Sequence, residues 1–388
     1  EIEINGISNN SKNIKKKFIF FAFTGNKTNG NLYINEARKN GATIVISQEE
    51  KGKDVIKLTN KDYFKIYSHL CSSFYNKKPK NIIAVTGTNG KTSVTDFCRQ
   101  IWSFYGLQSA SIGTLGIRET SEKYYHRIRN NLTTLDSSEL NKQLSKLYDK
   151  QISYVALEAS SHGIIQNRLD GITFNGAVFT NLSHDHLDYH KNMEKYFSAK
   201  MKLFTEHLKD GTCVSINLDD PYGMELYNKI KTKNFKFVNF GFNEKCELKL
   251  VQIKKIEKIW QLEILYKNKL YKTDIGLVGH FQIYNALAAA SICLGLGLKQ
   301  DSIFKSLSYL QTVPGRMQIV NHPLCKATII VDYAHTPNAL ENAILAVKKM
   351  NVSGKIYTLF GCGGERDHEK RSKMGEVAFK NSDFTIIT

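Results

Sequence analysis

Short apolar runs bounded by glycine, proline or polar residues recur along the 388-residue chain, and they predict strands that alternate with helices. In the first part of the chain, apolar runs at Phe18–Phe23 and Thr43–Ser47 flank a helical pattern over Leu32–Asn40. Gly41 follows that pattern, as a glycine commonly follows a helix. These residues predict a small α/β unit.

A second series of strands and helices begins near residue 80 and continues to about residue 312. Its short apolar runs, with helical patterns between them, are Ser153–Leu157, Gly176–Phe179 and Thr212–Ile216. This alternation predicts a mostly parallel sheet covered by helices on both faces. Three strand-like runs then follow one another and predict an antiparallel patch, before an alanine-rich helix: Phe235–Phe240, Lys249–Ile253, Trp260–Tyr266 and the helix Phe281–Leu296.

The segment Val313-Pro314-Gly315-Arg316 is typical of a hinge between domains. After it, strand runs at Ala327–Val331, Lys355–Phe360 and Phe384–Thr388 and a helical pattern over Ala339–Met350 predict a second sheet of the same kind. Because the chain stops on a strand, we expect this last domain to be incomplete. The sequence therefore predicts three domains, at residues 1–78, 79–312 and 313–388.

The composition agrees with several globular domains, since 41% of the residues are hydrophobic and 23% are charged. No apolar run approaches the roughly 20 residues of a membrane-spanning helix, and the first residues lack the features of a signal peptide. The expected location is the cytoplasm. The seven cysteines include no Cys-x-x-Cys pair, so we expect neither a zinc site nor a disulfide framework.

The net charge of +18, from 54 Lys and Arg against 36 Asp and Glu, would attract a polyanion. The lysines occur in short clusters dispersed over the chain, without the interleaved aromatic residues of a nucleic-acid-binding surface. Solvated surface lysines are therefore the expected explanation, and a small anionic substrate would also suit this charge. We expect neither nucleic acid nor a membrane as a partner.

One apolar run ends in a glycine-bracketed turn with the residues of a phosphate-binding loop. Gly87 and Gly90 allow successive backbone N–H groups to converge on phosphate oxygens. Lys91 adds a positive charge, and the Thr92 hydroxyl can bind Mg²⁺ at the start of the next helix. The general P-loop pattern requires a glycine where this chain has Val85, so this loop is shorter. The alternative is an ordinary strand-to-helix turn, but the flanking strand and helix favour a nucleotide site formed by Gly87, Thr88, Asn89, Gly90, Lys91 and Thr92.

Two further strand ends carry residue types that bind metals. Glu158 ends one apolar run, and residues 181–188, which include His186, follow the next. In an open α/β sheet, ligands bind beyond the carboxyl ends of the strands, so we expect both segments beside the phosphate loop. Taken singly, each is equally well explained as a helix cap or a hydrogen-bonded histidine. Together with the loop, Mg²⁺ sites are the better explanation.

Seven segments in order resemble the Mur ligases, and the resemblance runs from about Ser11 to the last residue. They are Thr-Gly-Thr-Asn-Gly-Lys-Thr at 86–92, Leu-Glu-Ala-Ser-Ser-His-Gly at 157–163, Thr-Asn-Leu-Ser-His-Asp-His-Leu-Asp-Tyr-His at 180–190, Ala-Lys at 199–200, Val-Pro-Gly-Arg-Met at 313–317, Val-Asp-Tyr-Ala-His-Thr-Pro at 331–337 and Phe-Gly-Cys-Gly-Gly-Glu-Arg-Asp at 360–367. The resemblance implies a three-domain α/β architecture. A small N-terminal domain would bind a UDP-linked substrate, a central P-loop-type domain would bind ATP, and a Rossmann-like C-terminal ligase domain would close on it.

The resemblance also implies an ATP-dependent amide ligase of peptidoglycan precursor synthesis that acts as a monomer. The most similar type adds the third amino acid to UDP-N-acetylmuramoyl-L-alanyl-D-glutamate. ATP phosphorylates the terminal carboxylate of this substrate, an amine attacks the acyl phosphate, and phosphate leaves. Because negative charge crowds on the phosphoryl oxygens, cations should dominate the catalysis.

By this resemblance, the two Mg²⁺ ions are held by four side chains, those of Thr92, Glu158, His186 and Lys200. Lys91 and Thr92 would bind the ATP phosphates and the first Mg²⁺. Glu158 and His186 would bind metal near the acyl phosphate. Lys200 would carry a CO₂-derived carbamate that binds the second Mg²⁺, which requires surroundings that favour the neutral amine. The alternative for Lys200 is an ordinary surface lysine on a helix.

The resemblance places the UDP-muramoyl-dipeptide substrate on six positions. Ser11 matches the serine of an Asp-Ser-Arg motif, but Asn10 and Lys12 flank it here, which puts the uridine contacts in question. The other matching positions are Thr133, Thr134, Ser160, Gln166 and Arg168. Arg168 has the forked guanidinium that suits an anionic oxygen.

The ATP base, ribose and phosphate would contact a third group of residues. Asn285 matches the second of two adenine-site asparagines, and Gln282 stands at the first. Asp332 would bind the ribose and Arg316 the phosphate, and both would approach ATP from the C-terminal domain together with His335. Closure of that domain would exclude water from the acyl phosphate.

The incoming amino acid is the least constrained part of the prediction. Arg366 matches an arginine that contacts its carboxylate, and the residues around it favour meso-diaminopimelate, with L-lysine as the alternative. The motif that distinguishes the two would begin just past Thr388. Further alternatives are a folylpolyglutamate synthase, which shares the loop and the lysine, a nucleotide-regulated nucleic-acid-binding protein, and a non-catalytic binding protein.

Overall fold

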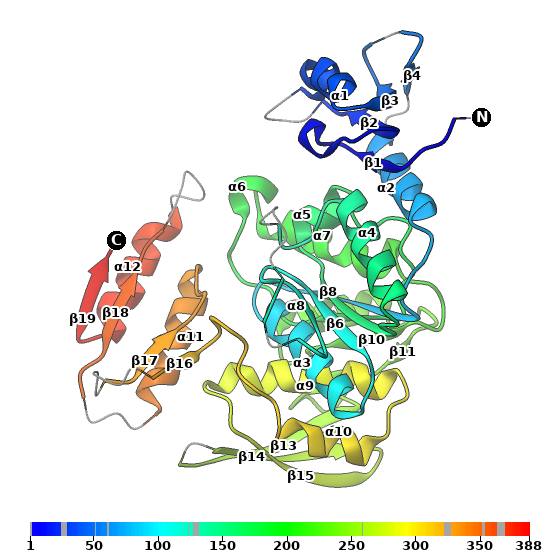
Figure 1. Ribbon diagram of the computed structural model, residues 1–388. Helices are drawn as coiled ribbons and strands as arrows, with labels where there is room; N and C mark the ends of the chain where they lie inside the picture. The colour runs from blue at the N-terminus through cyan, green and yellow to red at the C-terminus, as the bar shows by residue number, and fades with distance from the viewer. Residues whose placement is uncertain are drawn as a thin grey trace. The chain divides into compact units, whose positions relative to one another are not determined.

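The computed structural model describes residues 2–24, 29–50, 52–59, 62–122, 124–126, 132–257, 259–321, 327–350, 354–362 and 369–388 (Figure 1). The chain forms two compact units. The first contains Glu1–Pro79, Thr134–Gln151 and His162–Ile172, and the second contains Lys80–Thr133, Ile152–Ser161 and Thr173–Thr388. The three domain boundaries expected from the sequence stay a prediction.

The first unit is built on a four-stranded parallel sheet in the order β1-β2-β3-β4. Its strands are β1 (Gly6–Ser8), β2 (Phe18–Ala22), β3 (Ala42–Ser47) and β4 (Val55–Lys57). Successive side chains of a strand point to opposite faces, and here Phe20 and Phe21 pack into two different clusters. Phe20 packs with Ile34 of helix α1 (Ile34–Lys39), and Phe21 packs with Tyr67 of α2 (Tyr63–Phe74). The sheet is therefore covered on both faces.

Helix α4 (Ser137–Asp149) joins this unit from a distant part of the sequence and packs on α2. Asp136 caps its first turn by accepting a hydrogen bond from Ser138 N at 3.0 Å. The same carboxylate accepts a hydrogen bond from the Tyr67 hydroxyl at 2.8 Å. The cap therefore also fastens α4 to α2.

The second unit is centred on a seven-stranded sheet in the order β11-β10-β9-β5-β8-β6-β7, parallel except for the β6–β7 pair. Its strands are β5 (Asn81–Thr86), β6 (Ser109–Gly113), β7 (Gly116–Glu119), β8 (Tyr154–Glu158), β9 (Gly176–Phe179), β10 (Cys213–Ile216) and β11 (Lys236–Phe237). Strand β5 lies in the middle, between β8 and β9, and is buried from Ile82 to Thr86. This burial on both faces explains its continuous apolar sequence.

Helix α3 (Lys91–Phe104) packs on β6 and β8 of this sheet, and α9 (His280–Gly295) packs on β9 and β10. The other helices between β5 and the linker after α10 are α5 (Ser161–Ile165), α6 (Leu187–His190), α7 (Met193–Glu206), α8 (Pro221–Ile230) and α10 (Gln300–Leu307). The apolar stripe of α3, which consists of Val94, Phe97, Cys98, Ile101 and Trp102, is fully buried and packs against α9. Small alanine side chains on α9 permit this close approach.

A second sheet contains the predicted antiparallel patch, in the order β12-β13-β14-β15. Its strands are β12 (Phe240–Gly241), β13 (Leu248–Ile256), β14 (Ile259–Tyr266) and β15 (Lys269–Ile275). The single strand expected over Phe235–Phe240 was wrong, because β11 and β12 belong to different sheets. Between them, buried Asn239 donates its backbone N–H to Glu247 Oε2 at 2.6 Å, and its side chain accepts from Ile216 N at 3.2 Å. Because of these bonds, Asn239 does not continue the strand pairing of β11 into β12.

The last part of the second unit contains two short strand pairs and two helices. The antiparallel pair is β16 (Gln318–Val320) and β17 (Ile329–Val331), and the parallel pair is β18 (Tyr357–Phe360) and β19 (Phe384–Ile387). Helix α11 (Pro337–Lys348) packs on α12 (Glu369–Asn381) through Leu340, Ile344, Met374 and Ala378. The strands and the helix predicted here are confirmed with shifts of one or two residues at their ends. The single sheet expected from these strands was wrong for the described residues, because β17 and β18 belong to separate two-stranded pairs.

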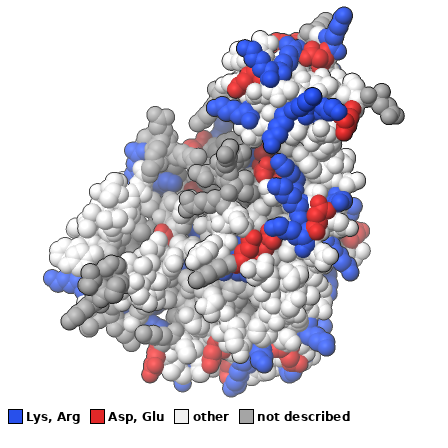
Figure 2. Space-filling model, viewed as in Figure 1, with Lys and Arg blue, Asp and Glu red and all other residues white. Residues whose placement is uncertain are grey.

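Two expectations about the surface and the cysteines can be compared with the structure. On the face drawn in Figure 2, acidic side chains lie among the basic ones, which occur from the top to the lower edge. Of the cysteines that the structure describes, Cys71, Cys98, Cys213, Cys246 and Cys293 are free and buried, and Cys362 is free and partly buried. In the described part of the chain, each helix is too short or too polar to cross a lipid bilayer.

Candidate active site

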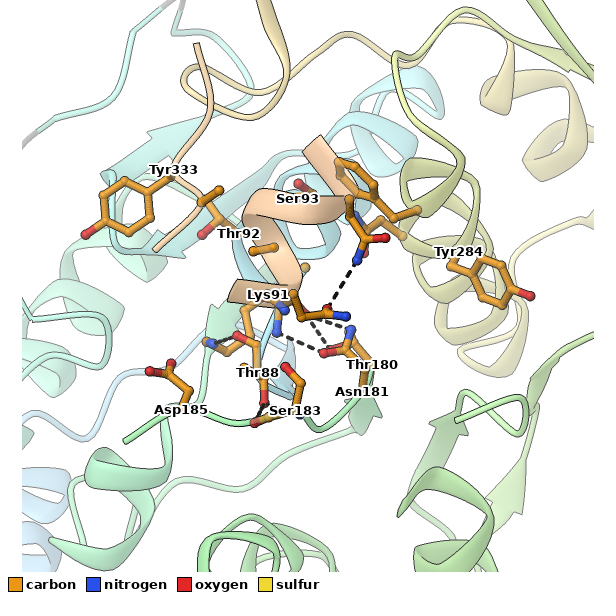
Figure 3. Close-up of a pocket in the computed structure, with 18 of the residues that line it drawn as sticks. Thr88, Lys91, Thr92, Ser93, Thr180, Asn181, Ser183, Asp185, Tyr284 and Tyr333 are labelled. Carbon is orange, nitrogen blue, oxygen red and sulfur yellow. Dashed lines mark hydrogen bonds between the residues drawn. The ribbon is translucent and has the colours of Figure 1, made fainter. Parts of the chain in front are cut away.

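A cavity of about 750 Å³ lies in the second unit, where strands β5, β8 and β9 end (Figure 3). Most of the predicted nucleotide and metal residues line it, namely Thr88, Asn89, Gly90, Lys91, Thr92, Glu158, His186, Asn285, Arg316, Asp332 and His335. Thr133 and Ser160, predicted for the substrate, line it as well. Figure 3 shows Tyr333 and Tyr284 on opposite sides of Lys91. Residues from widely separated parts of the sequence thus meet where an open α/β sheet is expected to bind its ligands.

Backbone conformation and space both require the two loop glycines. Gly87 has φ 148°, and a Cβ atom there would lie 1.9 Å from Thr180 Oγ1. Gly90 has φ 88°, and a Cβ atom there would lie 2.3 Å from Asn285 Oδ1. Both positions are therefore closed to a residue with a side chain unless neighbouring groups move.

Thr180 and Asn181, which follow β9, hydrogen bond to the backbone of the phosphate-type loop. Neither of them was named as a site residue from the sequence. Asn181 accepts from Thr88 N at 2.9 Å with its carbonyl and from Asn89 N at 3.0 Å with its side chain. Thr180 Oγ1 donates to Asn89 O at 2.7 Å. Both residues belong to the 180–190 motif, so that motif was the signal that pointed to them.

Lys91 lies inside the loop and donates hydrogen bonds to the carbonyl oxygens of Gly87 at 3.0 Å and Thr88 at 2.8 Å. Burial lowers its pKa below the usual value for lysine. The negative charges of Glu158 and Asp185 act in the opposite direction. The ammonium group thus lies against two carbonyl oxygens of the loop.

Lys200 on α7 is only 1% exposed and donates to the same Gly87 carbonyl oxygen at 2.7 Å. Its ammonium nitrogen also lies 4.6 Å from the centre of the Tyr196 ring. Burial lowers the pKa of Lys200 well below the usual value, and the nearby charge of Lys91 lowers it further. A buried lysine with these neighbours favours the neutral amine, unlike the surface lysine that was the alternative.

Glu158 ends β8 and is 2% exposed. Its carboxylate accepts from Thr114 N at 2.9 Å and from Thr114 Oγ1 at 3.2 Å. Thr114 Oγ1 also lies 3.2 Å from Thr133 Oγ1. A Cβ atom at Gly113 would come within 2.0 Å of Glu158 Oε1, so this glycine makes room for the carboxylate.

Asp185, which the sequence-based list of site residues also missed, is 2% exposed and lies between two histidines. Its Oδ2 is 3.3 Å from His186 Nε2 and 3.6 Å from His335 Nε2. Burial alone would raise the pKa of Asp185, but the nearby His335 side chain and the charges of His186, His335 and Lys370 bring it well below the usual value. Asp185 is therefore ionised. It lies close to His335, which comes after the linker at residues 311–316.

Arg316 lies against the first turn of α3, where its Nη2 donates to Thr92 Oγ1 at 2.8 Å. Its guanidinium carbon is 4.7 Å from the centre of the Tyr333 ring. Its Nε atom is buried and has no hydrogen-bond partner among the residues that the structure describes. The guanidinium thus contacts the first turn of α3 through Nη2, while its Nε donor is buried.

The other predicted nucleotide residues hydrogen bond to one another or to nearby backbone. Asn285 Nδ2 donates to Gln282 Oε1 at 2.8 Å, so the predicted adenine asparagine and its altered neighbour form a pair. Asp332 Oδ2 accepts from Met317 N at 2.8 Å, and burial raises the pKa of Asp332. His335 Nδ1 lies 2.9 Å from Tyr333 O.

The remaining predicted substrate residues lie in the first unit. Ser11 Oγ donates to Glu36 Oε2 at 2.7 Å. Arg168 donates to Thr134 O at 2.7 Å and to Gln166 Oε1 at 2.5 Å, so these three residues form one cluster. Arg366 lies outside the described residues.

In the described part of the chain, no three His, Cys, Asp or Glu side chains are grouped closely enough to hold a metal ion by themselves. The cavity instead offers the Thr92 hydroxyl and the Glu158 carboxylate beside a phosphate-type loop. This donor set fits Mg²⁺, which is usually bound by one or two carboxylates together with substrate phosphates.

Three family profiles match consecutive parts of the chain. They are described as the Mur ligase family catalytic domain at residues 3–79, the Mur ligase middle domain at residues 85–293, and the Mur ligase glutamate ligase domain at residues 315–388.

Whole proteins and solved structures give the same result. The UDP-N-acetylmuramoyl-L-alanyl-D-glutamate–2,6-diaminopimelate ligase of Agrobacterium fabrum is 38% identical over 387 residues, covering 100% of this chain and 78% of that protein. A solved structure of a ligase with the same name is 29% identical with a TM-score of 0.76, covering 99% of this chain and 78% of that chain. The fold is also that of the Thermotoga maritima MurF ligase in complex with ADP, which is 20% identical with a TM-score of 0.71 over 98% of this chain and 83% of that one.

The ordered motifs and the three-domain α/β fold expected from the sequence are thus confirmed, and the chain belongs to the Mur ligase family.

Proposed function

We propose that this protein is an ATP-dependent ligase that adds meso-diaminopimelate to UDP-N-acetylmuramoyl-L-alanyl-D-glutamate in peptidoglycan precursor synthesis. The observation that carries the proposal is the meeting of a phosphate-type loop, Glu158 and buried Lys200 around one end of the central sheet. The similarity to a diaminopimelate ligase over the whole chain supports the choice of substrates. We further propose that it works as a monomer in the bacterial cytoplasm.

The reaction has two chemical steps. A substrate carboxylate oxygen attacks the γ-phosphorus of ATP, ADP leaves, and an acyl phosphate forms. The amine of diaminopimelate then attacks the acyl carbon, the carbon–oxygen bond to phosphate breaks, and the amine loses a proton. The first step places new negative charge on phosphoryl oxygens, so its rate depends on positive groups held in position beforehand.

The loop residues hold the ATP phosphates in this proposal. Gly87 to Thr92 present backbone N–H groups at the start of α3, where the helix dipole also favours an anion. Lys91 now donates to two loop carbonyls, so its ammonium needs only a small reorientation to reach a phosphate. The buried Nε donor of Arg316 adds a second positive group from the linker to the C-terminal part.

Thr92, Glu158, His186 and a carbamate on Lys200 would hold two Mg²⁺ ions. These ions would neutralise charge on the phosphates and on the acyl phosphate. The lowered pKa of Lys200 supports the carbamate, because the amine attacks CO₂ only when it is unprotonated. Once formed, a carbamate would replace a second buried cation beside Gly87 with an anion.

The base and ribose would extend from the loop toward α9 and the C-terminal part. Asn285, directly beside Gly90, would contact the adenine. Asp332 would accept from the ribose, and His335 would approach the nucleotide from the same side. The UDP-muramoyl-dipeptide would contact the residues that the sequence assigns to it, Ser11, Thr133, Thr134, Ser160, Gln166 and Arg168.

The decisive experiment measures phosphate release from ATP with the UDP-muramoyl-dipeptide and either meso-diaminopimelate or L-lysine. We expect release that requires both the dipeptide and the amino acid and that is at least about tenfold faster with diaminopimelate. Faster release with lysine would change the acceptor, and Arg366 would be the first residue to re-examine. Absence of amino-acid-dependent release with either acceptor would refute the ligase assignment, and release with a folate and glutamate would replace it.

A further inference from the structure

The side chain of Gln100, in the second half of α3, pairs with the backbone of a residue 211 positions away. Gln100 Nε2 donates to Gln311 O at 3.0 Å, and Gln311 N donates to Gln100 Oε1 at 2.7 Å. The side-chain amide thus satisfies both backbone groups of one residue. We call this pair of bonds the Gln100 clamp.

Buried charged side chains fix the orientation of the Gln100 amide. Gln100 Nε2 also donates to Asp96 Oδ2 at 2.8 Å, which sets the direction of the amide. Asp96 is fully buried and accepts from Arg99 Nε at 2.7 Å and Nη2 at 3.2 Å. Arg118 of β7 lies 3.6 Å from the same carboxylate. A buried ion-pair network therefore positions the Gln100 amide on α3.

The segment that begins at the clamp leads directly to Arg316. Val313 is fully buried and accepts from Arg316 N at 3.0 Å, so the chain turns there. The far end is held by the bond from Arg316 Nη2 to Thr92 Oγ1 at 2.8 Å. Residues 311–316 are thus fastened to α3 at two places, near its middle and at its first turn.

The extended chain from Gln311 to Arg316 is at most about half as long again as the stretch of helix that it runs along. The helix between Thr92 and Gln100 spans about 12 Å at 1.5 Å per residue. The chain from Gln311 to Arg316 spans at most about 18 Å when fully extended. The turn at Val313 uses part of that length, so the clamp limits where Arg316 can reach.

We propose that Gln100 is a positioning residue that holds the start of this linker so that Arg316 reaches the phosphate loop. The inference rests on the proposed function, in which ATP binds at Thr92. A nucleotide with its metal at Thr92 displaces Arg316 from the hydroxyl, and the Gln100 clamp stays intact. Arg316 then moves about a fixed point, and its guanidinium stays within reach of the phosphates.

The first test measures hydrogen exchange of the Gln311 backbone N–H in the protein without nucleotide, which reports directly on the Gln100 clamp. Gln100→Met keeps the size of the side chain and removes both bonds, so exchange of this N–H should become at least about tenfold faster. Gln311→Ala is the matched control. The clamp uses only the backbone of Gln311, whose side chain donates to Tyr309 O at 3.3 Å, so exchange should stay unchanged. Equal exchange in Gln100→Met and the unaltered protein would overturn the proposal.

The second test asks whether Gln100 acts through Arg316. We expect Gln100→Met to lower kcat/KM for ATP about tenfold and Gln311→Ala to change it less than twofold. In a protein that already carries Arg316→Ala, Gln100→Met should lower kcat/KM for ATP by less than a further twofold, because the guanidinium that Gln100 positions is absent. The same loss in both backgrounds would indicate a general effect on α3 and would overturn the proposal. Absence of ATP use by the unaltered protein would refute the proposed function instead, and the exchange measurement would still decide about the clamp.

Discussion

Two lysines of this chain, Lys91 and Lys200, donate to one carbonyl oxygen, that of Gly87, and their surroundings decide what each can do. Lys91 follows the glycines of the loop, so its position in the sequence alone predicts contact with phosphate. Lys200 is followed by Met201 and Leu203 on an ordinary amphipathic helix, and nothing local in the sequence predicts that it is 1% exposed. Its burial beside Lys91 arises from the tertiary fold, and that burial lowers its pKa.

Replacement of Lys200 tests its proposed carbamate. We expect Lys200→Ala to lower the rate of ligation by about 100-fold or more, since it would remove an anion that binds Mg²⁺. Acetate or propionate at high concentration should restore part of the rate by placing a carboxylate in the vacated space. Lys202→Ala is the control, because Lys202 lies on the same helix with 42% of its side chain exposed, and its rate should change less than twofold. Full activity of Lys200→Ala would contradict the carbamate role.

At the scale of elements, the sequence pattern predicts a helix or strand well where apolar residues make up its buried run or stripe. The buried run of β5 is continuous in the sequence, the apolar residues of α3 recur every three or four positions, and the structure has both elements. The run over Phe235–Phe240 also looks like one strand, but β11 ends at Phe237 and β12 begins in a second sheet at Phe240, after the buried Asn239. A buried asparagine is recognised only from its partners, which lie elsewhere in the chain.

The two glycines that flank α3 provide a test of the loop. Gly90 before the helix and Gly106 after it both have positive φ, 88° and 73°, so alanine at either position is strained by about 1–3 kcal/mol. A Cβ atom at Gly90 would also meet Asn285 Oδ1 at 2.3 Å, whereas one at Gly106 meets nothing within 4 Å. We expect both variants to lose stability in urea unfolding, and only Gly90→Ala to lose affinity for ATP by at least about tenfold. Similar ATP affinity in both variants would show that the contact between Gly90 and Asn285 is unimportant for nucleotide binding.

At the scale of the whole molecule, the site depends on contacts that no local pattern contains. The motif residues Asp185 and His335 are 150 positions apart and meet at 3.6 Å, and Arg316 meets Thr92 at 2.8 Å across 224 positions. Ordered motifs predict that such residues belong to one site. They do not predict which pairs touch, because this depends on how the linker after residue 311 folds back on α3.

The two compact units give the proposal its largest-scale test, since their predicted ligands differ. The second unit carries the phosphate-type loop, and the first carries Ser11, Thr134 and Arg168. A ligand stabilises the part that binds it, by about 2.7 kcal/mol at a concentration 100 times its Kd. We therefore expect an ATP analogue with Mg²⁺ to slow hydrogen exchange mainly in residues 80–133 and 173–320. UDP alone should slow exchange mainly in residues 1–79 and 162–172. Arg168→Ala should weaken the protection by UDP and leave the protection by the ATP analogue unchanged, because Arg168 belongs to the first unit. If UDP protected only the second unit, the assignment of the UDP-linked substrate to Ser11 and Arg168 would be wrong, and the loop itself would be the binding site for both nucleotides.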